Sequence, residues 1–124
     1  MASLPKKIVI VEDNPFNMEL VHDILAIKGY DIYEAVDAEQ GIEMIAKIKP
    51  DLVLMDIQLP GMDGIEATRI IKSQEATKDI PVIAVTANAM KGDREEIISK
   101  GFDDYISKPI EISVLTEKVE EFLK

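Results

Sequence analysis

The sequence contains no cysteine, which excludes disulfide bonds, thiolate catalysis and zinc sites built on thiolates. It also lacks an apolar run long enough for a signal peptide or a membrane span, because the first such run covers only residues 8–11. We therefore expect a cytoplasmic protein that makes no use of a membrane.

Basic residues are in the minority, with 14 lysines and arginines against 24 aspartates and glutamates, and the formal net charge is -10. Nucleic-acid binding needs a basic surface that displaces counterions from phosphates, so we expect no nucleic-acid partner. An acidic chain instead suits the binding of a cation. Internal repeats, low-complexity tracts and glycine-rich or serine-rich linkers are also absent, and the 124 residues are expected to form one domain.

Three short apolar runs, at residues 8–11, 52–55 and 82–85, are rich in β-branched side chains. Uninterrupted runs of this kind are typical of strands that are buried on both faces of a sheet. Two further stretches, residues 31–35 and 104–107, mix polar with apolar residues. They predict strands with one wetter side, which belong at the edges of the sheet.

Amphipathic patterns separate these strands. The first helix is predicted to begin after Asn14 and to end at Gly29. The second is predicted to begin with a capping box of Asp37 and Gln40 and to end before Pro50. Its apolar face is predicted to comprise Ile42, Ile45 and Ala46. Three further helices are predicted over residues 65–73, 89–100 and 112–123.

The order of strand then helix repeats to the end of the chain, which predicts parallel strands joined by right-handed helical crossovers. The expected fold class is α/β, a doubly wound five-stranded parallel sheet with helices on both faces. If the two wetter strands are the edges, the strand order is the flavodoxin-like 2-1-3-4-5. A ligand is then expected in the crevice beyond the carboxyl ends of the first and third strands.

Acidic side chains stand at this edge of the predicted sheet. Glu12 and Asp13 follow the first strand and Asp56 follows the third. Carboxylates gathered in one crevice repel one another unless a cation neutralises them, and a set of oxygen ligands without histidine or cysteine favours Mg²⁺. The alternative is that these three residues are solvated loop acids, which are common in so acidic a chain.

Two more polar residues reach the same edge, because Thr86 ends the fourth strand and Lys108 ends the fifth. Taken singly, Thr86 could cap the following helix and Lys108 could be an ordinary surface lysine. Taken with the acids, their hydroxyl and ammonium groups predict a phosphate-binding site.

Four motifs resemble those of the receiver domains of two-component response regulators. They are VEDN at 11–14, LMDIQLP at 54–60 followed by Gly64, VTA at 85–87 and YISKP at 105–109. The resemblance covers essentially the whole chain. It implies one receiver domain over residues 1–124 without an output domain, closest to stand-alone regulators of the DivK type. Receivers of hybrid kinases also carry similar motifs, and one excised from a longer protein would look the same.

The resemblance implies a role for each matching residue. Asp56 would accept a phosphoryl group from a histidine kinase or a histidine phosphotransfer protein. Mg²⁺ would be bound by the side chains of Asp13 and Asp56 and by the backbone carbonyl of Gln58, with Glu12 acting mostly through a bound water. The phosphoryl oxygens would be held by Thr86, Ala87 and Lys108.

The resemblance also implies how a signal leaves the site. The Thr86 hydroxyl would move toward the phosphate and Tyr105 would turn inward behind it, remodelling the face of the fourth helix, fifth strand and fifth helix for a downstream regulatory protein. The alternative for Tyr105 is half-buried packing with a wet hydroxyl.

The resemblance has further implications for this chain. Gln58 and Asn88 would tune autodephosphorylation, and the peptide bond before Pro109 would be cis. We expect the protein to be a signalling module rather than an enzyme. We also expect it to be a monomer or a weak dimer.

Two other functions would use parts of the same site. A small Mg²⁺-dependent phosphohydrolase could use Asp56 as its nucleophile, but it would need an acid–base residue where the sequence has Gln58. Flavin binding would need a hydroxyl-rich and glycine-rich loop after the first strand, where Glu12 and Asp13 would repel a phosphate. The only histidine, His22, is expected to be a surface or boundary residue, so the phosphoryl donor must be another protein.

Overall fold

The computed structural model describes residues 4–87 and 93–124. Strands and helices alternate along the chain in the order β1 (Lys7–Val11), α1 (Pro15–Ile27), β2 (Asp31–Ala35), α2 (Ala38–Ile48), β3 (Leu52–Asp56), α3 (Gly64–Ser73), β4 (Val82–Thr86), α4 (Asp93–Ser99), β5 (Asp104–Ser107) and α5 (Ile112–Leu123). All five strands agree with the predicted ones to within one residue at each end. Of the helix predicted at 89–100, the structure describes α4, and residues 88–92 lie outside the described ranges.

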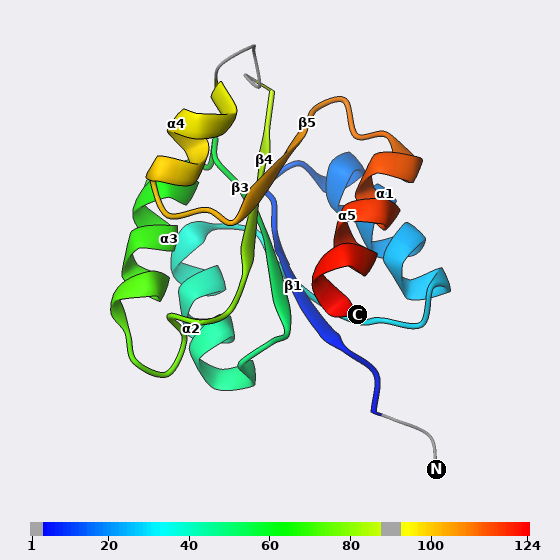
Figure 1. Cartoon of the computed structure of the whole chain (residues 1–124), viewed down its shortest axis with the longest axis horizontal. Coiled ribbons are helices and arrows are strands. Elements are labelled where there is room, and N and C mark those ends of the chain that lie inside the picture. The colour runs from blue at the N-terminus through cyan, green and yellow to red at the C-terminus, as the bar shows by residue number, and fades with distance from the viewer. Residues whose placement is uncertain (1–3, 88–92) are drawn as a thin grey trace.

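The five strands form one sheet in the order β2-β1-β3-β4-β5, and every neighbouring pair is parallel. The predicted fold class and strand order are therefore confirmed, with the two wetter strands at the edges. Helices α1 and α5 cover one face of the sheet, and α2, α3 and α4 cover the other (Figure 1). None of the described helices has the length and apolar character that crossing a membrane requires.

The sheet separates two apolar cores, because successive side chains of a strand point to opposite faces. Val9, Val53 and Ala84 lie in the core beneath α2, α3 and α4. Ile8 and Leu54 lie in the core beneath α1 and α5. Every residue of β3 and β4 is buried, which explains their unbroken apolar sequence.

The helix starts follow the predicted caps. Asn14 Oδ1 accepts a hydrogen bond from the Asn17 backbone N–H at 3.0 Å, and Asp37 Oδ1 accepts one from Gln40 N–H at 2.8 Å. The capping box of α2 differs from the expected one, because the Gln40 side chain accepts from the N–H of Val36 instead of that of Asp37. Gly29 follows α1 with a φ of 94°, a conformation that favours glycine at a helix end.

The predicted apolar face of α2 is wrong at Ala46, which is exposed. The buried side of the helix is formed by Ala38, Gly41 and Ile45. Ala46 follows Ile45 directly, so it lies about 100° further around the helix and points away from the sheet.

Candidate functional site

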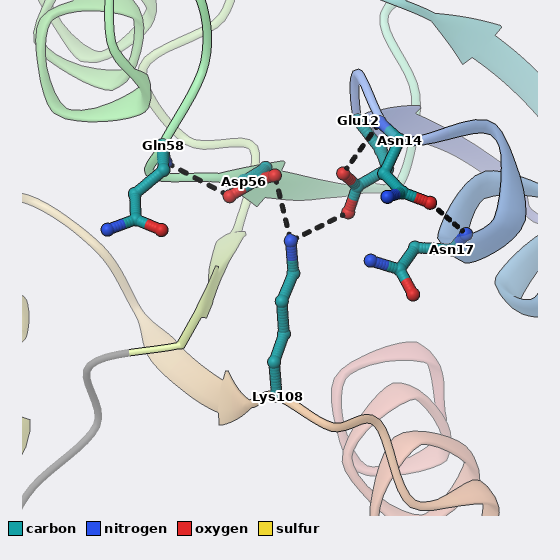
Figure 2. Close-up of polar contacts among 6 residues, drawn as sticks. All are labelled: Glu12, Asn14, Asn17, Asp56, Gln58 and Lys108. Atoms are coloured by element: carbon teal, nitrogen blue, oxygen red, sulfur yellow. Dashed lines mark hydrogen bonds and ion pairs between the residues drawn. The ribbon is translucent and has the colours of Figure 1, made fainter.

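The carboxyl ends of four strands bring the predicted polar residues to one edge of the sheet. Glu12 follows β1, Asp56 and Thr86 are the last residues of β3 and β4, and Lys108 follows β5. Figure 2 shows the side chains of Glu12, Asp56 and Lys108 converging from these separate elements. A parallel sheet makes this possible because all of its strands end at the same edge.

Three carboxylates form the acidic part of the site. Glu12, Asp13 and Asp56 each offer an oxygen, and these oxygens lie within 4.8 Å of one another. Asp56 and Glu12 are buried, with 2% and 4% of their surface exposed, whereas Asp13 is exposed. Two buried carboxylates at this separation repel each other unless positive charge is supplied.

Part of that positive charge comes from Lys108. Its Nζ lies 3.0 Å from Oδ2 of Asp56 and 3.3 Å from Oε1 of Glu12. Burial lowers the pKa of Lys108, but hydrogen bonding and attraction to Asp56 and Glu12 outweigh that effect and leave the pKa raised. The lysine is therefore held in its charged form between the two acids.

One ammonium group does not neutralise the whole cluster. Burial, followed by hydrogen bonding and repulsion involving Asp56, raises the pKa of Glu12 from 4.5 to about 7, although the Asn14 N–H and Lys108 oppose the rise. The Asn14 N–H donates to Glu12 Oε2 at 3.1 Å. The site thus favours taking up either a proton or a further cation, and its oxygen-only ligands fit Mg²⁺.

Backbone contacts fix the position of Asp56. The Gln58 N–H donates to Asp56 Oδ1 at 3.0 Å, so each carboxylate oxygen of Asp56 has a partner. Helix α3 begins at Gly64, whose N–H donates to the carbonyl of Ile57 at 2.9 Å. A Cβ at Gly64 would collide with the backbone carbonyl oxygen of Asp56, so glycine allows α3 to begin directly against this residue.

The structure also describes most of the remaining predicted residues. Thr86 is 2% exposed, and Ala87 is exposed in the turn that follows it. The Lys108–Pro109 peptide bond is cis, as the resemblance implied. Asn88 lies outside the described residues. Tyr105 is half-buried on the same face of the sheet as the core beneath α2, α3 and α4.

A cavity of about 310 Å³ adjoins Thr86 on this face. Its described lining residues are Ile57, Ile65, Thr86, Glu96, Ile97, Lys100 and Phe102. Tyr105 is not among them, although its neighbour in the sheet register, Ala84, is two residues before Thr86. The space beside Thr86 is thus large and mainly apolar, and the Tyr105 ring lies outside it.

His22 lies beside this centre, in a pocket that Glu12 and Asp13 also line. Its Nδ1 lies 2.6 Å from Oε2 of Glu34, an interaction between α1 and β2 in which both side chains are partly exposed. His22 is partly buried, so the prediction that it is a surface or boundary residue is confirmed. Sequence reasoning missed the hydrogen bond from Asn14 to Glu12 and the close approach of Gly64 to Asp56. The sequence identifies Asn14 as a helix cap. The hydrogen bond from its backbone N–H to Glu12 could not be predicted, because it depends on where β1 ends.

Comparison with known proteins decides the family. Residues 8–120 match the family model of the response regulator receiver domain. The chain belongs to this family. Receiver domains are signalling modules of two-component systems, so the resemblance seen in the sequence motifs is confirmed.

Relatives match this chain in sequence over nearly its full length. It is 42% identical over 120 residues to the polar-differentiation response regulator DivK of Brucella anthropi, covering 97% of this chain and 98% of that protein. The receiver domain of the sensor histidine kinase PA1611 from Pseudomonas aeruginosa is 36% identical, with a TM-score of 0.88 and coverage of 97% and 98%. That structure has a magnesium ion coordinated in its active-site cleft.

A third relative is the BeF3-activated receiver domain of RstA from Klebsiella pneumoniae. It is 32% identical, with a TM-score of 0.86 and coverage of 95% of this chain and 98% of its own. The receiver therefore shares its fold with domains from response regulators and from a sensor kinase alike.

Proposed function

We propose that this receiver is a phosphorylation-controlled switch in which Asp56 accepts a phosphoryl group from a histidine kinase or a histidine phosphotransfer protein. The observation that carries the proposal is the buried Asp56 carboxylate held 3.0 Å from the Lys108 ammonium, beside a second buried acid. This arrangement supplies a nucleophile, Asp56, together with a cation, Lys108, that can offset the negative charge of the incoming phosphoryl group. The similarity to DivK over nearly the full chain also supports it.

In the proposed reaction, an oxygen of Asp56 attacks phosphorus in line as the bond to the donor histidine nitrogen breaks. The nitrogen keeps the bonding electron pair, and an acyl phosphate forms on Asp56. Transfer of this kind passes through a loose transition state, so positioning and charge neutralisation provide most of the catalysis. The hydrogen bond from the Gln58 N–H and the contact with Gly64 provide the positioning.

The side chains of Asp13 and Asp56 and the backbone carbonyl of Gln58 would hold Mg²⁺, with Glu12 acting mostly through a bound water. The fit rests on the close spacing of the three carboxylates. It is supported by the raised pKa of Glu12, which results from burial and then from the neighbouring Asp56. When bound, Mg²⁺ supplies charge that offsets the phosphoryl oxygens. Binding of Mg²⁺ would favour the ionised form of Glu12.

The groups of this chain then retain the product. Lys108, freed from its ion pair with the Asp56 carboxylate, would pair with a phosphoryl oxygen. Thr86 and Ala87 would donate to the other oxygens from the end of β4. Gln58 and Asn88 would set how readily water reaches the acyl phosphate and therefore how long it lasts.

The signal would leave through Thr86 and Tyr105. Movement of the Thr86 hydroxyl toward the phosphate would open room for the Tyr105 ring beside it, and the cavity of about 310 Å³ offers space for that change. The face of α4, β5 and α5 would then bind a downstream regulatory protein. Phosphorylation can shift the equilibrium between the inactive and active forms only by the extent to which it stabilises the active form more, about 1–3 kcal/mol.

The proposal is tested by intact-mass measurement after incubation with acetyl phosphate and Mg²⁺. We expect one labile phosphoryl adduct on the wild-type protein and none on Asp56→Asn. Asp79→Asn changes an exposed aspartate that precedes β4, and it should retain the adduct. Turnover of unrelated phosphate esters without an adduct would favour a hydrolase, and absence of an adduct with Mg²⁺ present would refute the proposal.

A further inference from the structure

A second polar cluster joins β5 to α5 outside the candidate site. Asp104 is buried, and Lys118 Nζ donates to its Oδ2 at 3.0 Å. The other carboxylate oxygen, Oδ1, accepts from the backbone N–H of Tyr105 at 2.8 Å. The same Lys118 Nζ lies 5.9 Å from the centroid of the Tyr105 ring, within the range of a cation–π contact.

This cluster connects the two faces of the sheet. Helix α5 packs on the face that holds Ile106, whereas Tyr105 packs against the core on the opposite face. Because β5 is an edge strand, the Lys118 side chain can reach past it to the Tyr105 ring. The ion pair with Asp104 fixes the ammonium at that place, and the Lys118 side chain is only 28% exposed.

We propose that Lys118 is a positioning residue that retains the Tyr105 ring on the outer side of β5 and so sets the resting balance of the switch. The inference rests on the proposed switch role of Tyr105. The ring now lies beside the ammonium of α5 and outside the cavity that adjoins Thr86. Inward rotation would give up the contact with Lys118, so this contact opposes activation.

Removing the cation should therefore favour the active form before any phosphate is present. A partly exposed cation–π contact is worth a factor of about two to five in an equilibrium. In Lys118→Met, which keeps an unbranched apolar side chain, the ratio of inward to outward Tyr105 should rise by about this factor. A ligand that selects the inward form should then bind more tightly by about the same factor, because the competent fraction is larger.

The experiment uses the full chain with fluorotyrosine in place of its three tyrosines and follows the Tyr105 resonance by ¹⁹F NMR. Replacement of Tyr105 by Phe assigns the signal. Beryllofluoride with Mg²⁺ serves as the phosphate mimic, and its titration gives an apparent affinity for each variant. The expected result is an affinity about two- to fivefold higher in Lys118→Met than in the wild type, with Lys118→Arg close to the wild type.

Two further variants separate the contact from general effects of charge. Asp104→Asn keeps an acceptor for the Tyr105 N–H but loses the anion that fixes Lys118, so it should shift the affinity in the same direction. Lys28→Met removes a lysine that pairs with Glu120 of α5 at 3.9 Å, and it should leave the affinity unchanged.

An unchanged or weaker beryllofluoride affinity in Lys118→Met would overturn the inference, as would failure of Lys118→Arg to restore the wild-type value. The proposed function fails separately if Asp56 forms no adduct. If beryllofluoride binds but leaves the Tyr105 resonance in place, the switch role of Tyr105 is refuted, and the inference falls with it.

Discussion

The ammonium group of Lys108 lies 3.0 Å from Oδ2 of Asp56, although 52 residues separate the two in sequence. The same Nζ lies 3.3 Å from Glu12, so a single lysine is shared between two buried carboxylates. Removing either partner of such a cluster leaves uncompensated charge in a poorly solvated place. This shared ion pair determines how the site should respond to substitution, pH and metal.

Replacement of Lys108 by Met should strengthen Mg²⁺ binding while weakening retention of the phosphoryl group. The lysine attracts the same carboxylates that would hold the metal, and its charge repels the metal. We expect the Mg²⁺ affinity to rise by roughly three- to tenfold, as for removal of a nearby like charge that is partly screened. Isothermal titration calorimetry on the metal-free protein provides the measurement.

The control for this prediction is Lys78→Met, which removes a lysine paired with Glu75 at 3.2 Å on the surface. Its Mg²⁺ affinity should match the wild type. Equal or weaker affinity in Lys108→Met would show that the lysine does not compete with the metal.

The raised pKa of Glu12 predicts a pH dependence of stability in the absence of metal. The folded protein holds this proton up to about pH 7, whereas the unfolded chain releases it near pH 4.5. Protonation therefore favours the folded state, and this contribution is complete below pH 4.5 and lost as the pH rises through 7. The free energy of unfolding should fall over that window, by up to about 3 kcal/mol from this group.

Urea unfolding across this window measures the effect, and Glu12→Gln should lack the Glu12 share of the fall. Glu19→Gln changes an exposed glutamate of α1 and should keep the wild-type slope. Saturating Mg²⁺ should flatten the wild-type curve, because metal binding favours ionised Glu12. Identical slopes in the wild type and Glu12→Gln would contradict the prediction.

Replacement of Gly64 by Ala should destabilise the protein and disturb the position of Asp56. A new Cβ would meet the Asp56 carbonyl, which belongs to β3 and cannot move without shifting the strand. Overpacking of this kind costs about 1–3 kcal/mol. Thermal unfolding and the adduct yield with acetyl phosphate would both report it.

Gly41 provides the matched comparison, since it also lies within a helix and lacks space for a methyl group. A Cβ there would come within 2.8 Å of the Val11 side chain, and no backbone atom is among its nearest contacts. Gly41→Ala should therefore cost less stability than Gly64→Ala and leave the adduct yield nearer the wild type. If Gly41→Ala instead cost more stability than Gly64→Ala, strand β3 would adjust to an added methyl group more easily than the Val11 side chain does.

Substitution of Asp103 by Ala should weaken the fold far from the site. Asp103 Oδ2 accepts from the Val82 N–H at 2.8 Å and from Lys72 Nζ at 2.9 Å, so it joins the turn before β5 to β4 and α3. Loss of both bonds should lower the free energy of unfolding by about 1–3 kcal/mol. Phosphoryl adduct formation should persist at temperatures where the variant is folded.

The surface pair of Lys78 and Glu75 again supplies the contrast. Glu75→Ala removes an exposed ion pair and should change the free energy of unfolding by at most about 1 kcal/mol. A cost for Asp103→Ala no larger than this would indicate that its two hydrogen bonds contribute little.

Much of the fold could be read from local patterns. Apolar runs such as 52–55 and 82–85 predict buried strands because they are short, rich in β-branched residues and apolar at every position, as in strands covered on both faces. Ala46 shows the limit of that reasoning, because a small apolar residue is tolerated at the surface and does not mark a buried face.

The sequence by itself determined the strand order, the family and which polar residues reach one edge of the sheet, since parallel strands must end together. The tertiary structure decided that Lys108 is shared between Asp56 and Glu12, that Gly64 lies against the Asp56 carbonyl and that Lys118 reaches the Tyr105 ring. These contacts depend on helix placement and side-chain rotamers to within about an ångström. Residue spacing along the chain does not encode that precision.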